Sequence, residues 1–81
     1  MTIDIHFYSI SKELAGSDRK RLSVPDRSTL GATLDILFHE LPNLAPLRAS
    51  CLYAVGLDYA PPDTVLSDGS EVSIIPPVQG G

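Results

Sequence analysis

The sequence lacks several features that secreted or membrane-spanning proteins need. Cys51 is its only cysteine, so no intramolecular disulfide can form, and this residue opens an apolar stretch where we expect it to be buried. The longest apolar runs are a few residues, far below the roughly 20 that span a bilayer. A signal peptide has a basic segment followed by an apolar one, and the N-terminus has no such pair of segments. These absences predict a soluble, cytoplasmic protein with no membrane partner.

Basic charge is also scarce. Six Lys and Arg residues stand against ten Asp and Glu residues, which gives a net charge of -4, and Arg19-Lys20-Arg21 is the one basic cluster. Nucleic-acid-binding proteins need a basic face to displace counterions from phosphates, so nucleic acid is not an expected partner. His6 and His39 fall on different predicted elements, and we expect neither a metal site nor a bound cofactor.

What is present suits one small globular domain. The chain has 81 residues, of which 43 % are apolar and 20 % charged, a balance too apolar for a disordered chain. Ile3, Ile5 and Phe7 alternate with polar residues, which is typical of a half-buried strand. A helical turn is expected to end at Gly16. Further strands are predicted over residues 20–24, 51–55, 58–60 and 71–75.

The strongest helix signal follows Ser28, the predicted N-cap, and Pro42 ends it. Residues 43–49 fit a second short helix or a loop. The first two strands can pair as a hairpin, and the helix can serve as the crossover to a later parallel strand. We therefore predict an α+β, β-grasp fold, a mixed sheet packed on one main helix. Five large apolar residues share one stripe of that helix: Leu30, Leu34, Leu37, Phe38 and Leu41.

The C-terminus is the most unusual feature. Pro76 and Pro77 cannot donate to a sheet and favour an extended backbone, so residues 1–75 should form the domain and residues 76–81 a flexible tail. Gly80 and Gly81 lack a Cβ and can enter a narrow channel. The terminal carboxylate would need activation as an acyl-adenylate, and the chain has no phosphate-binding glycine loop, which implies an external enzyme. The alternative is that the two glycines are a frayed end.

The residues before the diglycine resemble a known family. The segment from Leu66 to Gly81, LSDGSEVSIIPPVQGG, resembles the ending of the molybdopterin synthase small subunit family (MoaD), which typically has a DGDEV turn, two apolar residues and PPVxGG. The segments KELAG at 12–16 and YAVG at 53–56 also resemble that family, so the likeness spans the whole chain. Ser70, Gln79 and Gly56 depart from the usual pattern, and Gln79 lies beside the diglycine.

The resemblance implies a ubiquitin-like sulfur carrier that works with partners. An E1-like enzyme would use ATP to adenylate Gly81, and a sulfurtransferase would convert it into a thiocarboxylate. The tail, which comprises Pro76, Pro77, Val78, Gln79, Gly80 and Gly81, would then enter the large subunit of molybdopterin synthase. There it would donate sulfur to cyclic pyranopterin monophosphate to form the molybdopterin dithiolene. The catalytic residues would belong to the large subunit, and the family suggests a heterotetramer.

A docking surface is also predicted. Strand parity points Tyr8 and Ile75 away from the helix, and Tyr59 falls on a short edge segment. Exposed apolar residues on one face would form a partner interface, as matching positions do in the family, although scattered surface apolar residues are common. Three other functions stay open: a sulfur carrier for thiamin or cysteine synthesis, a ubiquitin-like modifier joined through Gly81 to lysines, and a plain interaction module. The Pro76-Pro77 pair favours the molybdopterin pathway over the thiamin one.

Overall fold

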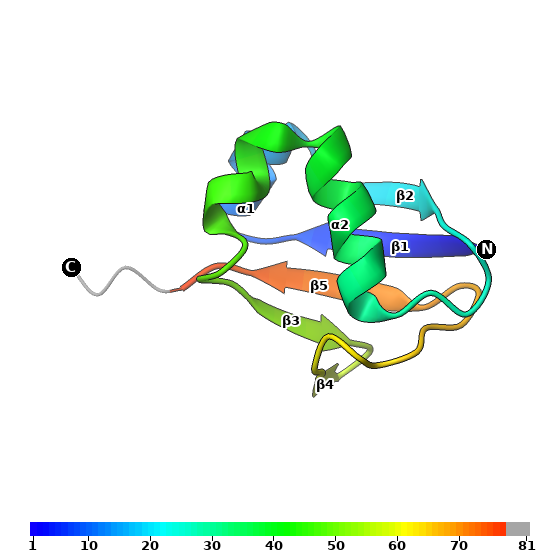
Figure 1. Ribbon diagram of the computed structural model, residues 1–81. Helices are drawn as coiled ribbons and strands as arrows, with labels where there is room; N and C mark the ends of the chain where they lie inside the picture. The colour runs from blue at the N-terminus through cyan, green and yellow to red at the C-terminus, as the bar shows by residue number, and fades with distance from the viewer. Residues whose placement is uncertain (78–81) are drawn as a thin grey trace.

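A mixed sheet covered on one face by helices makes up the computed structural model, which describes residues 1–77 (Figure 1). The five strands take the order β2-β1-β5-β3-β4. In chain order the elements are β1 (Thr2–Phe7), α1 (Ile10–Ala15), β2 (Arg19–Ser23), α2 (Leu30–Glu40), the 3-10 helix η1 (Pro42–Leu47), β3 (Leu52–Val55), β4 (Asp58–Tyr59) and β5 (Glu71–Ile75).

Strand pairing confirms the predicted hairpin and crossover. Strand β1 pairs antiparallel with β2 and parallel with β5, while β3 pairs antiparallel with both β5 and β4. The crossover that brings β5 beside β1 contains α2, which lies across one face of the sheet (Figure 1). Strand β2 begins one residue before its predicted start, and β3 begins one residue after. The α+β prediction is confirmed.

The core lies between α2 and the sheet face it covers. Ile3, Ile5 and Phe7 of β1 are buried, as are Val72 and Ile74 of β5, which confirms the period-2 interpretation of both strands. Each such side chain contributes about 1.5–3 kcal/mol when fully buried. The apolar stripe of α2 is buried at four positions, Leu30, Leu34, Leu37 and Phe38. Its last member, Leu41, is the C-cap before Pro42 and is half-buried.

The predicted N-cap of α2 is wrong by one residue. Thr29, not Ser28, has the extended backbone of an N-cap, and its Oγ1 accepts a hydrogen bond from the Ala32 amide at 3.1 Å. Ser28 instead belongs to the preceding turn, because its Oγ donates to the Pro25 carbonyl at 2.6 Å. Both residues carry a hydroxyl that can cap a helix, so the sequence pattern alone does not show which of the two is the N-cap.

The segment after α2 forms the 3-10 helix η1, with Pro46 inside it, so this stretch is a short helix and not a loop. Cys51 follows it and is buried, as predicted, and burial raises the pKa of its thiol. Nearby, the Tyr53 hydroxyl donates to the Arg48 carbonyl at 2.7 Å. Burial, followed by the Coulombic effect of Cys51, raises the pKa of Tyr53 to about 12. Both groups therefore stay protonated at neutral pH.

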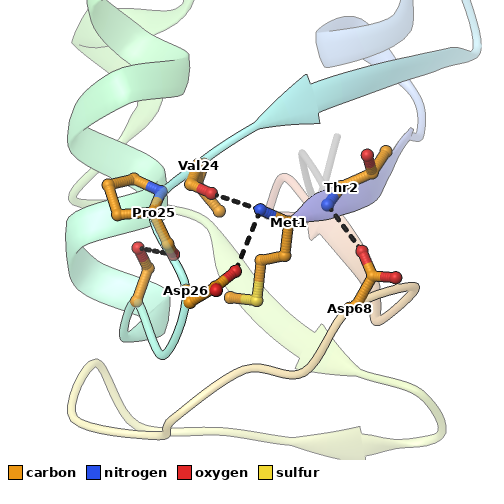
Figure 2. Close-up of polar contacts among 7 residues, drawn as sticks. Met1, Thr2, Val24, Pro25, Asp26 and Asp68 are labelled. Carbon is orange, nitrogen blue, oxygen red and sulfur yellow. Dashed lines mark hydrogen bonds and ion pairs between the residues drawn. The ribbon is translucent and has the colours of Figure 1, made fainter.

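Hydrogen bonds tie the N-terminus to two turns (Figure 2). The Met1 ammonium group donates to the Val24 carbonyl at 2.7 Å and lies 3.3 Å from Asp26 Oδ1. The Thr2 amide donates to Asp68 Oδ1 at 2.8 Å, and the Gly69 amide donates to the Thr2 carbonyl at 2.8 Å. The turn before β5 is thereby fixed to the start of β1. This anchored end of the sheet lies opposite the end where the chain leaves β5 (Figure 1).

Candidate functional site: the root of the C-terminal tail

The root of the C-terminal tail follows strand β5. Strand β5 ends at Ile75, after which Pro76 is buried and Pro77 is exposed. Neither proline has an amide hydrogen to extend the sheet ladder, which explains why the strand stops here. The predicted reactive residue and its neighbours lie outside the described residues: Val78, Gln79, Gly80 and Gly81.

A groove runs beside this root, and we call it the tail groove. One wall is the end of β5 with the two prolines, and the other is the segment that joins β1 to α1. Leu47 of η1 also lines it, and Lys12 and Glu13 of α1 supply charged side chains. Its apolar lining consists of Tyr8, Ile10, Leu47, Ile75, Pro76 and Pro77. An apolar groove at this position can bind an apolar surface of any protein that receives the tail.

The structure brings together two of the three predicted interface residues. Phe7 pairs with Ile74 in the parallel ladder, so the next residues are Tyr8, directly after the end of β1, and Ile75, the last residue of β5. Because neighbouring positions point to opposite faces, both lie on the side away from the buried Phe7 and Ile74. Tyr8 is 49 % exposed and Ile75 is half-buried. Both line the tail groove, while their binding of a partner stays a prediction.

Tyr59 lies on the same sheet face but farther away. It pairs with Ala54 of β3, which in turn pairs with Ser73 of β5, so β3 separates Tyr59 from β5. Tyr59 is 69 % exposed and is not among the residues that line the tail groove. The three predicted residues therefore share a face without forming one groove.

Leu52 completes this face, and the sequence interpretation missed it. It pairs directly with Ile75 across β3 and β5, and it is 55 % exposed. Strand parity contains a signal for it: Tyr53 and Val55 pack against the core, so Leu52 must point outward. We call Tyr8, Leu52, Tyr59 and Ile75 the outer patch. Its residues come from four segments of the chain.

Charged residues near the sheet are partly paired. Lys20 Nζ lies 3.3 Å from Glu40 Oε1, and Arg21 Nε lies 3.5 Å from Asp4 Oδ1 across the β1–β2 pair. Two of the three residues of the basic cluster thus lie beside acidic partners. Within residues 1–77, no three His, Cys, Asp or Glu side chains gather as a metal site would require. None of the described helices has the length and apolar character needed to cross a membrane.

A family model matches this chain from residue 5 to residue 81, and it describes the ThiS family. The chain belongs to the ThiS family. This ThiS-family chain is 30 % identical over 83 residues to the molybdopterin synthase sulfur carrier subunit of Chlamydomonas reinhardtii, with the whole of both chains covered. The predicted membership in the family of molybdopterin synthase small subunits is therefore confirmed.

Solved structures agree on the fold. SAMP1 from Haloferax volcanii superimposes on the chain with a TM-score of 0.91 at 24 % identity, with all of both chains covered. A chain from the complex of subunits 1 and 2 of the Helicobacter pylori molybdopterin-converting factor gives a TM-score of 0.74 at 23 % identity, again over the whole of both chains. These likenesses confirm the predicted ubiquitin-like β-grasp fold of this ThiS-family chain.

Proposed function

We propose that this chain is the sulfur-carrier small subunit of molybdopterin synthase. The observation that carries the proposal is the full-length relationship to a molybdopterin synthase sulfur carrier subunit, together with a family match that extends through Gly81. The sequence PPVQGG adds a reason from chemistry. Two prolines end the last strand, and two residues without a Cβ leave the terminal carboxylate accessible to a partner.

The proposed chemistry takes place on the Gly81 carboxylate. An E1-like enzyme transfers AMP from ATP to this carboxylate, and pyrophosphate leaves. A persulfide on a sulfurtransferase then attacks the acyl-adenylate and AMP leaves. A thiol reduces the resulting acyl disulfide, so that the end of the chain becomes a thiocarboxylate. The carrier itself binds no cofactor in this scheme, because ATP is bound and consumed by the activating enzyme.

The proposed recipient of the sulfur is the large subunit of molybdopterin synthase. The tail enters its active site and donates its one sulfur to cyclic pyranopterin monophosphate, and two such transfers from two carrier chains form the molybdopterin dithiolene. The catalytic residues belong to the large subunit, so the carrier is a sulfur donor in a cytoplasmic heterotetramer. Support comes from the Helicobacter pylori complex of subunits 1 and 2, one chain of which shares this fold. In this assembly Tyr8, Tyr59 and Ile75 of the outer patch contact the large subunit.

Intact-mass spectrometry tests the first half of the cycle. The chain is co-expressed with its activating enzyme and sulfurtransferase, in a host where a known carrier becomes thiocarboxylated. We expect the mass to show that one oxygen has been replaced by one sulfur, and fragmentation to place the sulfur at Gly81. An unmodified mass would contradict the carrier proposal, and ladders of isopeptide-linked products would instead indicate a protein modifier.

Reconstitution tests the second half. The purified thiocarboxylated chain is mixed with the large subunit and cyclic pyranopterin monophosphate, and molybdopterin is measured. We expect molybdopterin to form in proportion to the thiocarboxylate consumed. If the thiocarboxylate forms but no molybdopterin appears, the chain serves another sulfur pathway, such as thiamin or cysteine synthesis.

A further inference from the structure

The segment between β1 and α1 is held by a buried serine. The Ser11 side chain is fully buried, and its hydroxyl bonds to the backbone of Tyr8 on both sides of that residue. The Tyr8 amide donates to Ser11 Oγ at 3.0 Å, and Ser11 Oγ donates to the Tyr8 carbonyl at 2.6 Å. The Ser11 amide also donates to that carbonyl, at 3.2 Å. Ser11 therefore satisfies both backbone polar groups of Tyr8.

Ser9, inside the same segment, has a strained backbone. Its φ of 56° and ψ of -135° fall in a region that glycine adopts freely and other residues rarely enter. Its side chain makes no capping hydrogen bond that would offset this strain. The Ser9 carbonyl accepts from the Lys12 amide at 3.0 Å, so bonds to Ser11 and Lys12 hold the segment closed around the strained residue.

This strained turn exposes two large apolar side chains at the tail groove. Tyr8 is 49 % exposed and Ile10 is 47 % exposed, and they flank Ser9 on either side. Both line the groove opposite Pro76 and Pro77. Exposed apolar surface and a strained backbone are both unfavourable in the free protein, and they coincide at the root of the tail.

The length of the remaining chain limits where a partner can bind. Four residues follow Pro77, and a fully extended chain of that length spans at most about 14 Å. A protein that holds the Gly81 carboxyl in its active site must come at least that close to Pro77. Since Pro77 is itself part of the groove lining, such a protein lies next to the tail groove.

We propose that Ser9 and Ser11 are positioning residues, and that the strained turn they form presents Tyr8 and Ile10 to the large subunit of molybdopterin synthase as one preformed wall of the tail groove. This inference rests on the proposed function, which supplies the partner. The apolar lining predicts an apolar rim around the partner's channel that receives the tail. A preformed wall favours binding because the two side chains do not have to be ordered when the complex forms.

Ser9→Gly is the decisive variant, because it separates folding from binding. Glycine adopts the Ser9 conformation without strain, so the midpoint of thermal unfolding should equal or exceed that of the original protein. Glycine also permits other conformations, so the wall loses its fixed shape. With the purified large subunit of the same organism, titration calorimetry should show a Kd raised about tenfold, as expected when one or two side chains must be ordered on binding. In molybdopterin formation, KM for the thiocarboxylated carrier should rise equally while kcat stays unchanged.

Two further variants test the Ser9 hydroxyl and the Ser11 hydroxyl separately. Ser9→Ala removes the hydroxyl and keeps the restriction on the backbone, so its Kd should match that of the original protein. Ser11→Ala removes the bonds to Tyr8 and should raise Kd when introduced alone. In the Ser9→Gly background it should raise Kd little further, because two changes that release the same turn are not additive.

Several results would overturn this assignment. An unchanged Kd and KM for Ser9→Gly, in a system where the original chain donates sulfur normally, would remove the positioning role and leave the proposed function intact. A fall in kcat alone would do the same. If the original chain fails to bind the large subunit, both proposals fail. If light scattering shows that the original chain dimerises and Ser9→Gly does not, the groove is covered by a second copy instead.

Discussion

At the scale of single residues, Thr33 stands out because it places a hydroxyl in the core. The residue is fully buried on α2, and its Oγ1 has no hydrogen-bond partner among the residues that the structure describes. A buried polar group without a partner costs about 1–3 kcal/mol of stability, since it gives up its hydrogen bonds to water on folding. Thr33 therefore lowers the stability of an otherwise apolar helix face.

Replacing Thr33 by Val should stabilise the protein. Valine keeps the branched shape and removes only the unpaired hydroxyl, so we expect the free energy of unfolding to rise by about 1 kcal/mol. For a domain of this size that corresponds to an increase of roughly 4–8 °C in the thermal midpoint. Urea and thermal unfolding measure both quantities. Thr33→Ser is the matched control, because it keeps the hydroxyl and loses the methyl group, and it should be less stable than the original protein. A destabilised Thr33→Val variant would show that the hydroxyl is satisfied in solution.

At the scale of elements, the start of α2 depends on which hydroxyl caps it. Thr29 accepts the Ala32 amide, whereas Ser28 bonds back to Pro25. The preceding turn decides this, because Arg27 takes a positive φ of 64° and turns the chain before Ser28. No periodicity in the sequence encodes that backbone angle, which is why the sequence places the cap one residue too early.

Thr29→Ala and Ser28→Ala should therefore have unequal effects. Loss of the Thr29 cap leaves the Ala32 amide without its side-chain acceptor and should lower the free energy of unfolding by about 1 kcal/mol. The Ser28 hydroxyl donates to a carbonyl in an exposed bond that water can replace, so its loss should cost no more than about 0.5 kcal/mol. Urea denaturation of the two variants measures the difference. A larger loss for Ser28→Ala would restore Ser28 as the cap.

At the scale of the whole molecule, the folded core and the proposed reactive end are separate in sequence. The core cluster runs from Ile3 to Ile74, and the last strand ends at Ile75. At the other end of the sheet, the Asp68 turn is bonded to the start of β1 (Figure 2). Within residues 1–77, which the structure describes, the strands that form the sheet thus end at Ile75.

Deletion of Gly81 should separate folding from sulfur transfer. We expect the thermal midpoint to stay within roughly 2–4 °C of the original value, because none of the core residues is removed and changes away from the core alter stability by no more than about 0.5 kcal/mol. Molybdopterin formation should be abolished, because the acyl end becomes one residue shorter and no longer reaches the same position. Thermal unfolding and the reconstitution assay measure the two effects. A clear fall in the thermal midpoint would show that the tail contributes to the fold.

The sequence alone was sufficient for features that depend on neighbouring residues. The alternation in β1 and β5 and the apolar stripe of α2 are local periodicities, so they predict the burial of these elements directly. The hairpin and the parallel crossover followed from element order and the handedness of chain connections. The ending PPVQGG indicated the family, which the match through Gly81 confirms.

Only the tertiary structure decided what meets at the root of the tail. Ile75 pairs with Leu52, and it lies one position beyond the Phe7–Ile74 pair, as Tyr8 does. Tyr59 is separated from β5 by β3. The pairing registers between distant strands determine these positions. The strained Ser9 and the buried Ser11 carry no sequence signal, since two serines in a polar segment fit many turns. Local chemistry thus specified the elements and the diglycine end on which the proposed function rests. Contacts between residues far apart in sequence determined the surface around that end.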